Sequence, residues 1–200
     1  SAAIFVGFLI LYMVTLRPGV LPADSGEFQL AATQLNIAHP PGFPLYVLVG
    51  WFFTRLPGEP ATNLNFLSAI FSALTLALLP WAIEEVNPPD ERWWHWHPFM
   101  GLFGALLLGT TPTFWAQATT TNIRSLTTLF AIAGLFCLLR WINFREQNWL
   151  VAAVAVMSLG VTHHLSLAFF AVVMVGVVLW TDWQVLSRPK LLLKLDRKSV

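Results

Sequence analysis

Long apolar runs constrain the fold of this chain more than any other feature. The hydrocarbon core of a bilayer is about 30 Å thick, and a helix needs roughly 20 residues to cross it. Runs that approach this length recur at residues 2–16, 44–56, 65–83, 99–118, 125–142 and 149–180. The sequence therefore predicts an all-α protein, a multispanning transmembrane helical bundle of about five to seven membrane helices.

The composition agrees with a membrane protein and excludes other classes. Hydrophobic residues make up 56% of the chain and charged residues only 10%, whereas soluble domains carry about 25% charged residues. With a net charge of +1 there is no basic surface for nucleic acid, so membrane lipids are the expected surroundings. Because Cys137 is the only cysteine, an internal disulfide framework and a multi-cysteine zinc site are excluded.

The two ends of the chain suggest a part of something longer. Ser1 opens directly into an apolar run, and we expect residues 1–200 to be the N-terminal part of one transmembrane domain whose remainder is missing. Residues 184–200 carry five basic side chains around a leucine patch. This tail is either a basic interfacial segment on the cytoplasmic side of the membrane or the start of a domain that continues.

The last apolar run, residues 149–180, is too long for one upright crossing. Its roughly 32 residues would extend about 48 Å at 1.5 Å per residue. It therefore either tilts strongly or breaks near His163 and His164. These histidines face a watery cavity on one interpretation, and mark a helix break or a satisfied core pair on the other. Two histidines without a nearby acid do not predict a metal site.

A polar loop, residues 17–43, separates the first two apolar runs and carries Asp24 and Glu27. Apolar residues follow at helical spacing, namely Phe28, Ala31, Ala32 and Leu35. This pattern predicts an amphipathic helix on the membrane surface. One interpretation makes Asp24 the N-cap and Glu27 its capping-box partner. The other points both carboxylates into a cavity, where Asp24 acts as a general base or holds a divalent cation.

His39 precedes a rigid segment, Pro40-Pro41-Gly42. Each proline fixes its own φ and lacks an N–H donor, so this segment ends the helix and stiffens the entry to the next apolar run. That rigidity would hold His39 near the acidic pair. The alternative is an ordinary polar loop residue.

Three sequence blocks together resemble a known family. They read Asp24-Ser25-Gly26-Glu27-Phe28, then Ala38-His39-Pro40-Pro41-Gly42-Phe43-Pro44-Leu45-Tyr46, then Asn65-Phe66-Leu67-Ser68-Ala69. Their order and spacing are similar to those of the protein O-mannosyltransferase-related membrane family, the transmembrane protein 260-like group (domain of unknown function 2723) of the GT-C glycosyltransferase superfamily. The resemblance runs over nearly the whole chain, which would be the N-terminal half of such an enzyme.

The resemblance implies a transferase that moves a sugar from a polyprenyl-phosphate donor to a hydroxyl of a protein or glycan acceptor, on the non-cytoplasmic side. It places Asp24 where that superfamily carries an essential acid, with Glu27 as its shared neighbour. Apart from a possible divalent cation, no cofactor is implied. Departing phosphate needs positive charge or donors, which Arg124, His39, His163 or His164 would supply. Arg124 would otherwise be an interfacial arginine at the start of an apolar run.

The chain departs from the family pattern at a second polar block. Asn122 stands where the family usually has glutamate, and Arg124 where it has tyrosine. Asparagine cannot act as a base. The chain would therefore use another group at that point, rely on Asp24 alone, or lack activity.

Two further functions stay open from the sequence. One is a transporter or flippase of a lipid-linked or small polar solute, in which Asp24, Arg124 and His163 line a path. The other is a non-catalytic relative that binds the lipid carrier, favoured by Asn122. The sequence contains no Asn-x-Ser/Thr acceptor, and we expect a multi-pass protein of the bacterial inner membrane with its site facing outward.

Overall fold

The computed structural model, which describes residues 1–86 and 97–184, confirms the all-α prediction: its regular elements are helices, and no strand occurs among these residues. In chain order they are α1 (Ala2–Val14), α2 (Ala23–Gln34), α3 (Pro44–Phe53), α4 (Pro60–Val86), α5 (His97–Gly109), α6 (Pro112–Thr119), α7 (Arg124–Phe144), α8 (Gln147–His163) and α9 (Ser166–Thr181). Of the predicted basic tail, residues 184–200, only Gln184 lies within the described part.

Two described helices are long and apolar enough to cross a membrane, and they make this chain a membrane protein. They are α4, with 27 residues, and α7, with 21 residues. A third candidate combines α5 and α6, which meet at a bend of 73°. The helices α1, α3 and α9 are apolar but shorter. The larger number of five to seven crossings stays a prediction.

The predicted run at residues 99–118 is not one straight helix. It ends at Gly109 and restarts at Pro112, the first residue of α6. Proline is well tolerated at this position because the first helical N–H groups have no partner inside the helix. On the other side of the bend, the Tyr12 hydroxyl donates to the Gly109 carbonyl at 2.8 Å. A side chain of α1 therefore satisfies a carbonyl at the end of α5.

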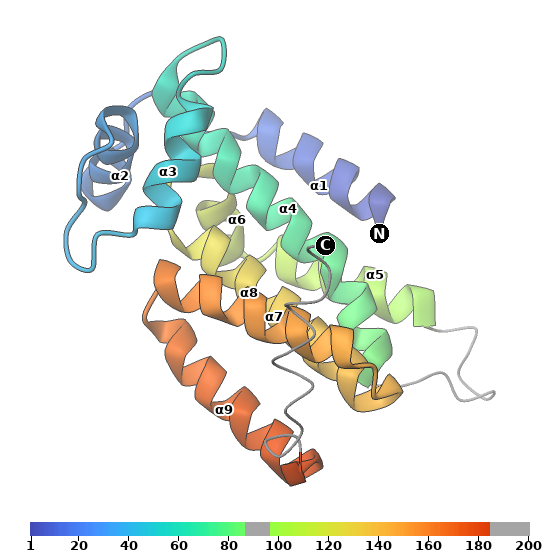
Figure 1. Cartoon of the computed structure of the whole chain (residues 1–200). Coiled ribbons are helices and arrows are strands. Elements are labelled where there is room, and N and C mark those ends of the chain that lie inside the picture. Colours follow the sequence, from blue (N-terminus) through green and yellow to red (C-terminus); the bar gives the residue numbers. More distant parts are fainter. Residues whose placement is uncertain (87–96, 185–200) are drawn as a thin grey trace, which may run out of the picture.

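The long run at residues 149–180 breaks, as one of the two interpretations predicted. The helix α8 ends at His163, and His164 adopts an extended conformation before α9 begins at Ser166. Figure 1 shows α9 turning away from α8 at this point. The break leaves His164 outside regular helix, beside the start of α7.

The helix α4 forms the centre of the bundle and packs against α1, α5, α6 and α7 (Figure 1). Small buried residues along it, Ser68, Ala69, Ser72 and Ala73, allow neighbouring helices to approach closely. At its far end, Glu85 accepts a hydrogen bond from Arg140 of α7 at 2.7 Å. The two helices are thereby held together at the end opposite to α2.

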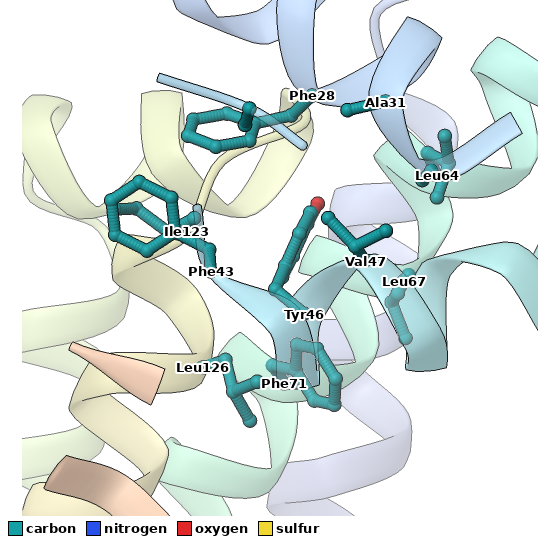
Figure 2. Close-up of a cluster of buried hydrophobic side chains, with 12 residues drawn as sticks. Phe28, Ala31, Phe43, Tyr46, Val47, Leu64, Leu67, Phe71, Ile123 and Leu126 are labelled. Carbon is teal, nitrogen blue, oxygen red and sulfur yellow. The ribbon is translucent and has the colours of Figure 1, made fainter. Parts of the chain in front are cut away.

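The loop at residues 17–43 contains the predicted helix, α2, which lies beside α3 at one edge of the molecule (Figure 1). Its apolar residues Phe28, Ala31 and Ala32 are buried in a cluster with residues of α3, α4 and α7. Figure 2 shows Phe28 and Ala31 facing Tyr46 and Val47 of α3. The apolar face of α2 therefore packs on protein, and the placement of this helix at the membrane surface stays a prediction.

Candidate functional site

A buried polar network fixes the loop at residues 17–22 against two other segments. The fully buried Asn65 of α4 donates from Nδ2 to the Arg17 carbonyl at 2.6 Å. Its Oδ1 accepts from the Thr121 N–H at 2.8 Å and from Gln29 Nε2 at 3.1 Å. The Gln29 Oε1 in turn accepts from the Leu21 N–H at 2.9 Å. One amide on α4 thus joins the loop, α2 and the segment that precedes α7.

The start of α2 is held close to this loop by Gly26. A Cβ added at Gly26 would lie 2.2 Å from the backbone oxygen of Leu21, a distance that no side chain tolerates. The helix begins at Ala23, which has a positive φ of 56°, and Pro22 is its N-cap. No side-chain cap hydrogen bond forms. The predicted capping box, with Asp24 as the N-cap, is therefore wrong, because the helix begins two residues earlier, with Pro22 as its N-cap.

A cavity of about 380 Å³ lies between the start of α2, the segment around His39 and the start of α7. Five predicted site residues line it: Asp24, His39, Asn122, Arg124 and His164. The remaining lining residues are Ser25, Phe28, Pro40, Pro41, Phe43, Gln117, Thr120, Thr121 and Ile123. Residues from four distant parts of the sequence therefore meet at one hollow.

Glu27 does not line this cavity, although Asp24 does. Its Oε1 accepts from the His39 N–H at 2.5 Å, and its Oε2 lies 2.9 Å from His39 Nδ1. These hydrogen bonds lower the pKa of the Glu27 carboxyl, because they stabilise the charged form. The prediction that both carboxylates point together into one cavity is wrong, since Glu27 turns to His39 instead.

Arg124, the first residue of α7, brings an exposed positive charge to the cavity. Among the described residues it forms no ion pair with a carboxylate. His164 lies on the same side, and both burial and the charge of Arg124 lower its pKa. The Ser166 N–H donates to His164 Nδ1 at 3.1 Å, so the neutral ring carries its proton on Nε2. This side of the cavity therefore offers a cation and an N–H donor.

His163 is buried and does not line the cavity. Its Nε2 lies 3.1 Å from the carbonyl oxygen of Ile123, the residue that precedes Arg124. The ring packs among Phe43, Tyr46 and Phe130, and Nδ1 has no hydrogen-bond partner in the described part. His163 thus supports the start of α7 from behind the cavity wall.

The side-chain amide of Asn122, which lines the cavity, both donates and accepts hydrogen bonds that fix the cavity wall. Its Nδ2 donates to the carbonyls of Gln117 and Thr120, at 2.5 and 2.7 Å. Its Oδ1 accepts from the Ser125 N–H at 3.0 Å, which satisfies one of the free donors at the start of α7. A glutamate could not donate to the two carbonyls. The asparagine is therefore a structural link between α6 and α7 in this chain.

Sequence reasoning missed Gln29 and Thr121. Gln29 is 3% exposed, and it is the one strongly polar residue on the buried face of α2. An isolated glutamine next to Phe28 at helical spacing was the available signal, because a buried amide must find partners. Thr121 gave no comparable signal, since its role depends on where α4 lies.

The described residues do not build a metal site by themselves. No group of three or more histidine, cysteine, aspartate or glutamate side chains among them lies close enough to hold a metal ion. Only Asp24 contributes a carboxylate to the cavity. The possible divalent cation, with Asp24 as its ligand, stays a prediction.

Comparison with known proteins gives one family. The family model described as "Protein O-mannosyl-transferase TMEM260 N-terminal domain" matches residues 24–187. The mouse protein O-mannosyl-transferase TMEM260 is 27% identical over 169 residues, which cover 81% of this chain. The Dictyostelium discoideum protein O-mannosyl-transferase tmem260 is 26% identical over 138 residues, or 66% of this chain. No solved structure matches.

These matches cover only a part of each relative, 22% of the mouse protein and 16% of the Dictyostelium protein. The matched region begins at Asp24 and includes all the blocks that carry the sequence resemblance. The family model accounts for well over half of the chain, and the family resemblance drawn from the sequence is confirmed, although the match covers far less of these relatives than the expected N-terminal half. The chain belongs to the family of protein O-mannosyl-transferase TMEM260 N-terminal domains.

Proposed function

We propose that this chain is the N-terminal part of a GT-C-type membrane glycosyltransferase, which moves a sugar from a polyprenyl-phosphate donor to a hydroxyl of a protein or glycan acceptor. The observation that carries the proposal is the 380 Å³ cavity, lined by Asp24 and by Arg124, which forms no ion pair within residues 1–86 and 97–184. The name that the curated relatives bear, protein O-mannosyl-transferase, favours mannose as the sugar and protein as the acceptor.

The two sides of the cavity suit the two halves of the reaction. Arg124 and the Nε2–H of His164 bind the donor phosphate and stabilise the charge that grows on it as the sugar leaves. The backbone N–H groups at the start of α7 add to this positive field. Asp24 lies on the α2 side, where its carboxylate accepts a hydrogen bond from the incoming hydroxyl.

The membrane setting is part of the proposal. Further crossings beyond α4 and α7 would come from α1, from α8 and α9, and from the rest of the longer protein. We place the cavity on the non-cytoplasmic side of a bacterial inner membrane, where a lipid-linked donor reaches it from the bilayer.

A second candidate is a non-catalytic protein that binds the lipid carrier. Asn122 favours it, because the family glutamate is replaced by an amide that serves the backbone. Such a protein would keep Arg124 and His164 as a phosphate site and would turn over no sugar. The break between α8 and α9 is the feature that a transporter would share.

The test is transfer of labelled sugar from polyprenyl-phosphate donors by the full-length protein in lipid discs. Asp24→Asn should lower the rate by about 10²–10⁴-fold, and Arg124→Gln by about 10²-fold or more. The matched control is Arg145→Gln, the same substitution just beyond the opposite end of α7, which should leave the rate unchanged.

Each outcome separates the candidates. Transfer by the wild type that both cavity variants reduce supports the transferase. Binding of the lipid phosphate without transfer, lost in Arg124→Gln, supports the carrier-binding protein. Equal loss in Arg124→Gln and Arg145→Gln would refute a specific phosphate site, because each change removes one positive charge at one end of α7.

A further inference from the structure

His39 is held in one orientation by contacts on several sides. Glu27 accepts from both its backbone N–H and its Nδ1, at 2.5 and 2.9 Å. The rings of Phe28 and Phe43 each lie 5.5 Å from the imidazole, centroid to centroid. The backbone contact fixes where the residue sits, and the side-chain contact fixes how its ring is turned. An ordinary polar loop residue does not require contacts that fix both its backbone and its ring.

The same contacts determine where the ring can react. An ionised carboxylate only accepts hydrogen bonds, so Nδ1 must carry the proton that faces Glu27. In the neutral ring, Nε2 then holds a lone pair. His39 lines the cavity that contains Asp24 and Arg124, whereas Glu27 stands behind it. A carboxylate that orients an imidazole in this way is the arrangement that prepares a histidine to accept a proton.

We propose that His39 is the catalytic residue that accepts the proton of the acceptor hydroxyl, and that Glu27 is the positioning residue that orients its ring. This inference rests on the proposed transferase function and gives the proton a destination other than Asp24. Asp24 then takes no proton: its carboxylate stabilises the imidazolium that forms, and His39 removes the single proton of the hydroxyl.

The step balances as a single displacement. The acceptor oxygen forms a bond to the anomeric carbon of the sugar while its proton passes to Nε2 of His39. The bond between that carbon and the phosphate oxygen breaks, and its electron pair leaves with the lipid phosphate. The imidazolium that forms is stabilised by the Glu27 carboxylate, and it later returns its proton to water.

The charges around His39 favour this direction of transfer. Asp24 and Glu27 of α2 are the carboxylates on its side, and both stabilise an imidazolium. Arg124 and His164 enter the cavity from the start of α7 and from the α8–α9 break, where positive charge serves the departing phosphate. The cavity thus separates a proton-accepting side from a phosphate-binding side.

The experiment is the pH dependence of sugar transfer by the full-length protein in lipid discs, with a polyprenyl-phosphate mannose donor. In the wild type the rate should rise with pH, because only the neutral imidazole can accept a proton. His39→Gln should lower the rate by about 10²–10⁴-fold and remove that rise. Added imidazole should restore transfer to His39→Ala in proportion to its concentration.

Two more variants separate positioning from mere folding. Glu27→Gln should lower the rate and move the rise to lower pH, because the imidazolium loses a neighbouring negative charge. Asp24→Asn should lower the rate and keep the rise. If wild type transfers sugar and His39→Gln keeps the same rise, the inference is wrong while the transferase stands. If the wild type transfers no sugar from any donor, the role of His39 and the proposed transferase function are both wrong.

Discussion

Asn65 offers the sharpest test of how the candidate site is assembled. Replacing it by alanine removes the amide that joins the loop at residues 17–22, α2 and the segment before α7. The Thr121 N–H would lose its partner at 2.8 Å at a fully buried position, and the Arg17 carbonyl would lose its partner at 2.6 Å at a partly buried one. The Gln29 Nε2 would keep two other acceptors, the Gly19 carbonyl and the Thr121 hydroxyl, so losing Asn65 costs it less than it costs the two backbone groups.

The expected cost follows from those two stranded groups. A buried backbone donor or acceptor without a partner costs about 1–3 kcal/mol, so Asn65→Ala should destabilise this junction by about 2–5 kcal/mol. Since about 1.4 kcal/mol is a factor of ten in an equilibrium, the junction should open at least about 30-fold more often. The backbone N–H of Arg17, which donates to the Thr119 carbonyl at 3.1 Å, reports this opening without touching Asn65.

Hydrogen exchange of the full-length protein in lipid discs, read by mass spectrometry, measures it directly. Peptides that cover residues 17–34 and 119–123 should lose protection in Asn65→Ala. The control is Asn63→Ala, two residues earlier on α4. The Asn63 Nδ2 donates to the Leu56 carbonyl at an exposed position, so this substitution should change the free energy of opening by less than about 0.5 kcal/mol. Equal protection in the two variants would refute the reasoning.

Three further outcomes follow from single contacts. Gly26→Ala should cost about 1–3 kcal/mol or more in thermal unfolding, because its Cβ would lie 2.2 Å from the Leu21 oxygen, whereas Gly7→Ala meets nothing within 4 Å and should be neutral or stabilising. Asn122→Glu should destabilise by about 2–4 kcal/mol in the same assay and gain no transferase activity, because the carboxylate faces two carbonyl oxygens; a stable variant with higher activity would contradict this. The pKa of Glu27 is below its ordinary value of 4.5, so the stabilisation it provides is complete above that pH and is lost as the pH falls through the lowered pKa; Glu27→Gln should remove this acid dependence from an unfolding titration.

The sequence predicted the helices well because apolar run length is a local property. Every predicted run contains a helix, and even the interruption near His163 could be read from a run too long for one crossing. The bend between α5 and α6 had local signals in Gly109 and Pro112, but neither gives its direction. At the bend, the Tyr12 hydroxyl of α1 satisfies the Gly109 carbonyl, a contact that apolar run length does not predict.

The candidate site was predictable in its members and less so in their roles. The polar loop and the family resemblance single out Asp24, and a charge at the start of an apolar run singles out Arg124; both line one cavity. Helical spacing pairs Glu27 with Asp24, because residues three apart share a helix face. In the structure the His39 N–H donates to the Glu27 carboxylate instead. The two residues are 12 positions apart, so helical spacing does not predict this contact. Asn122 looked like a missing acid, whereas its backbone partners give it a structural reason to be an amide.

The network around Asn65 explains how the site can tolerate an amide at position 122. Asp24 and Arg124 share no hydrogen bond or ion pair in the described part of the chain, so neither one places the other. Asn65 fixes the loop before Asp24 and also the Thr121 N–H, three residues before Arg124. The two sides of the cavity therefore take their positions from α4. Exchanging an acid for asparagine at residue 122 alters the joint between α6 and α7 and leaves this anchor intact, so a change in chemistry there need not move Asp24 or His39.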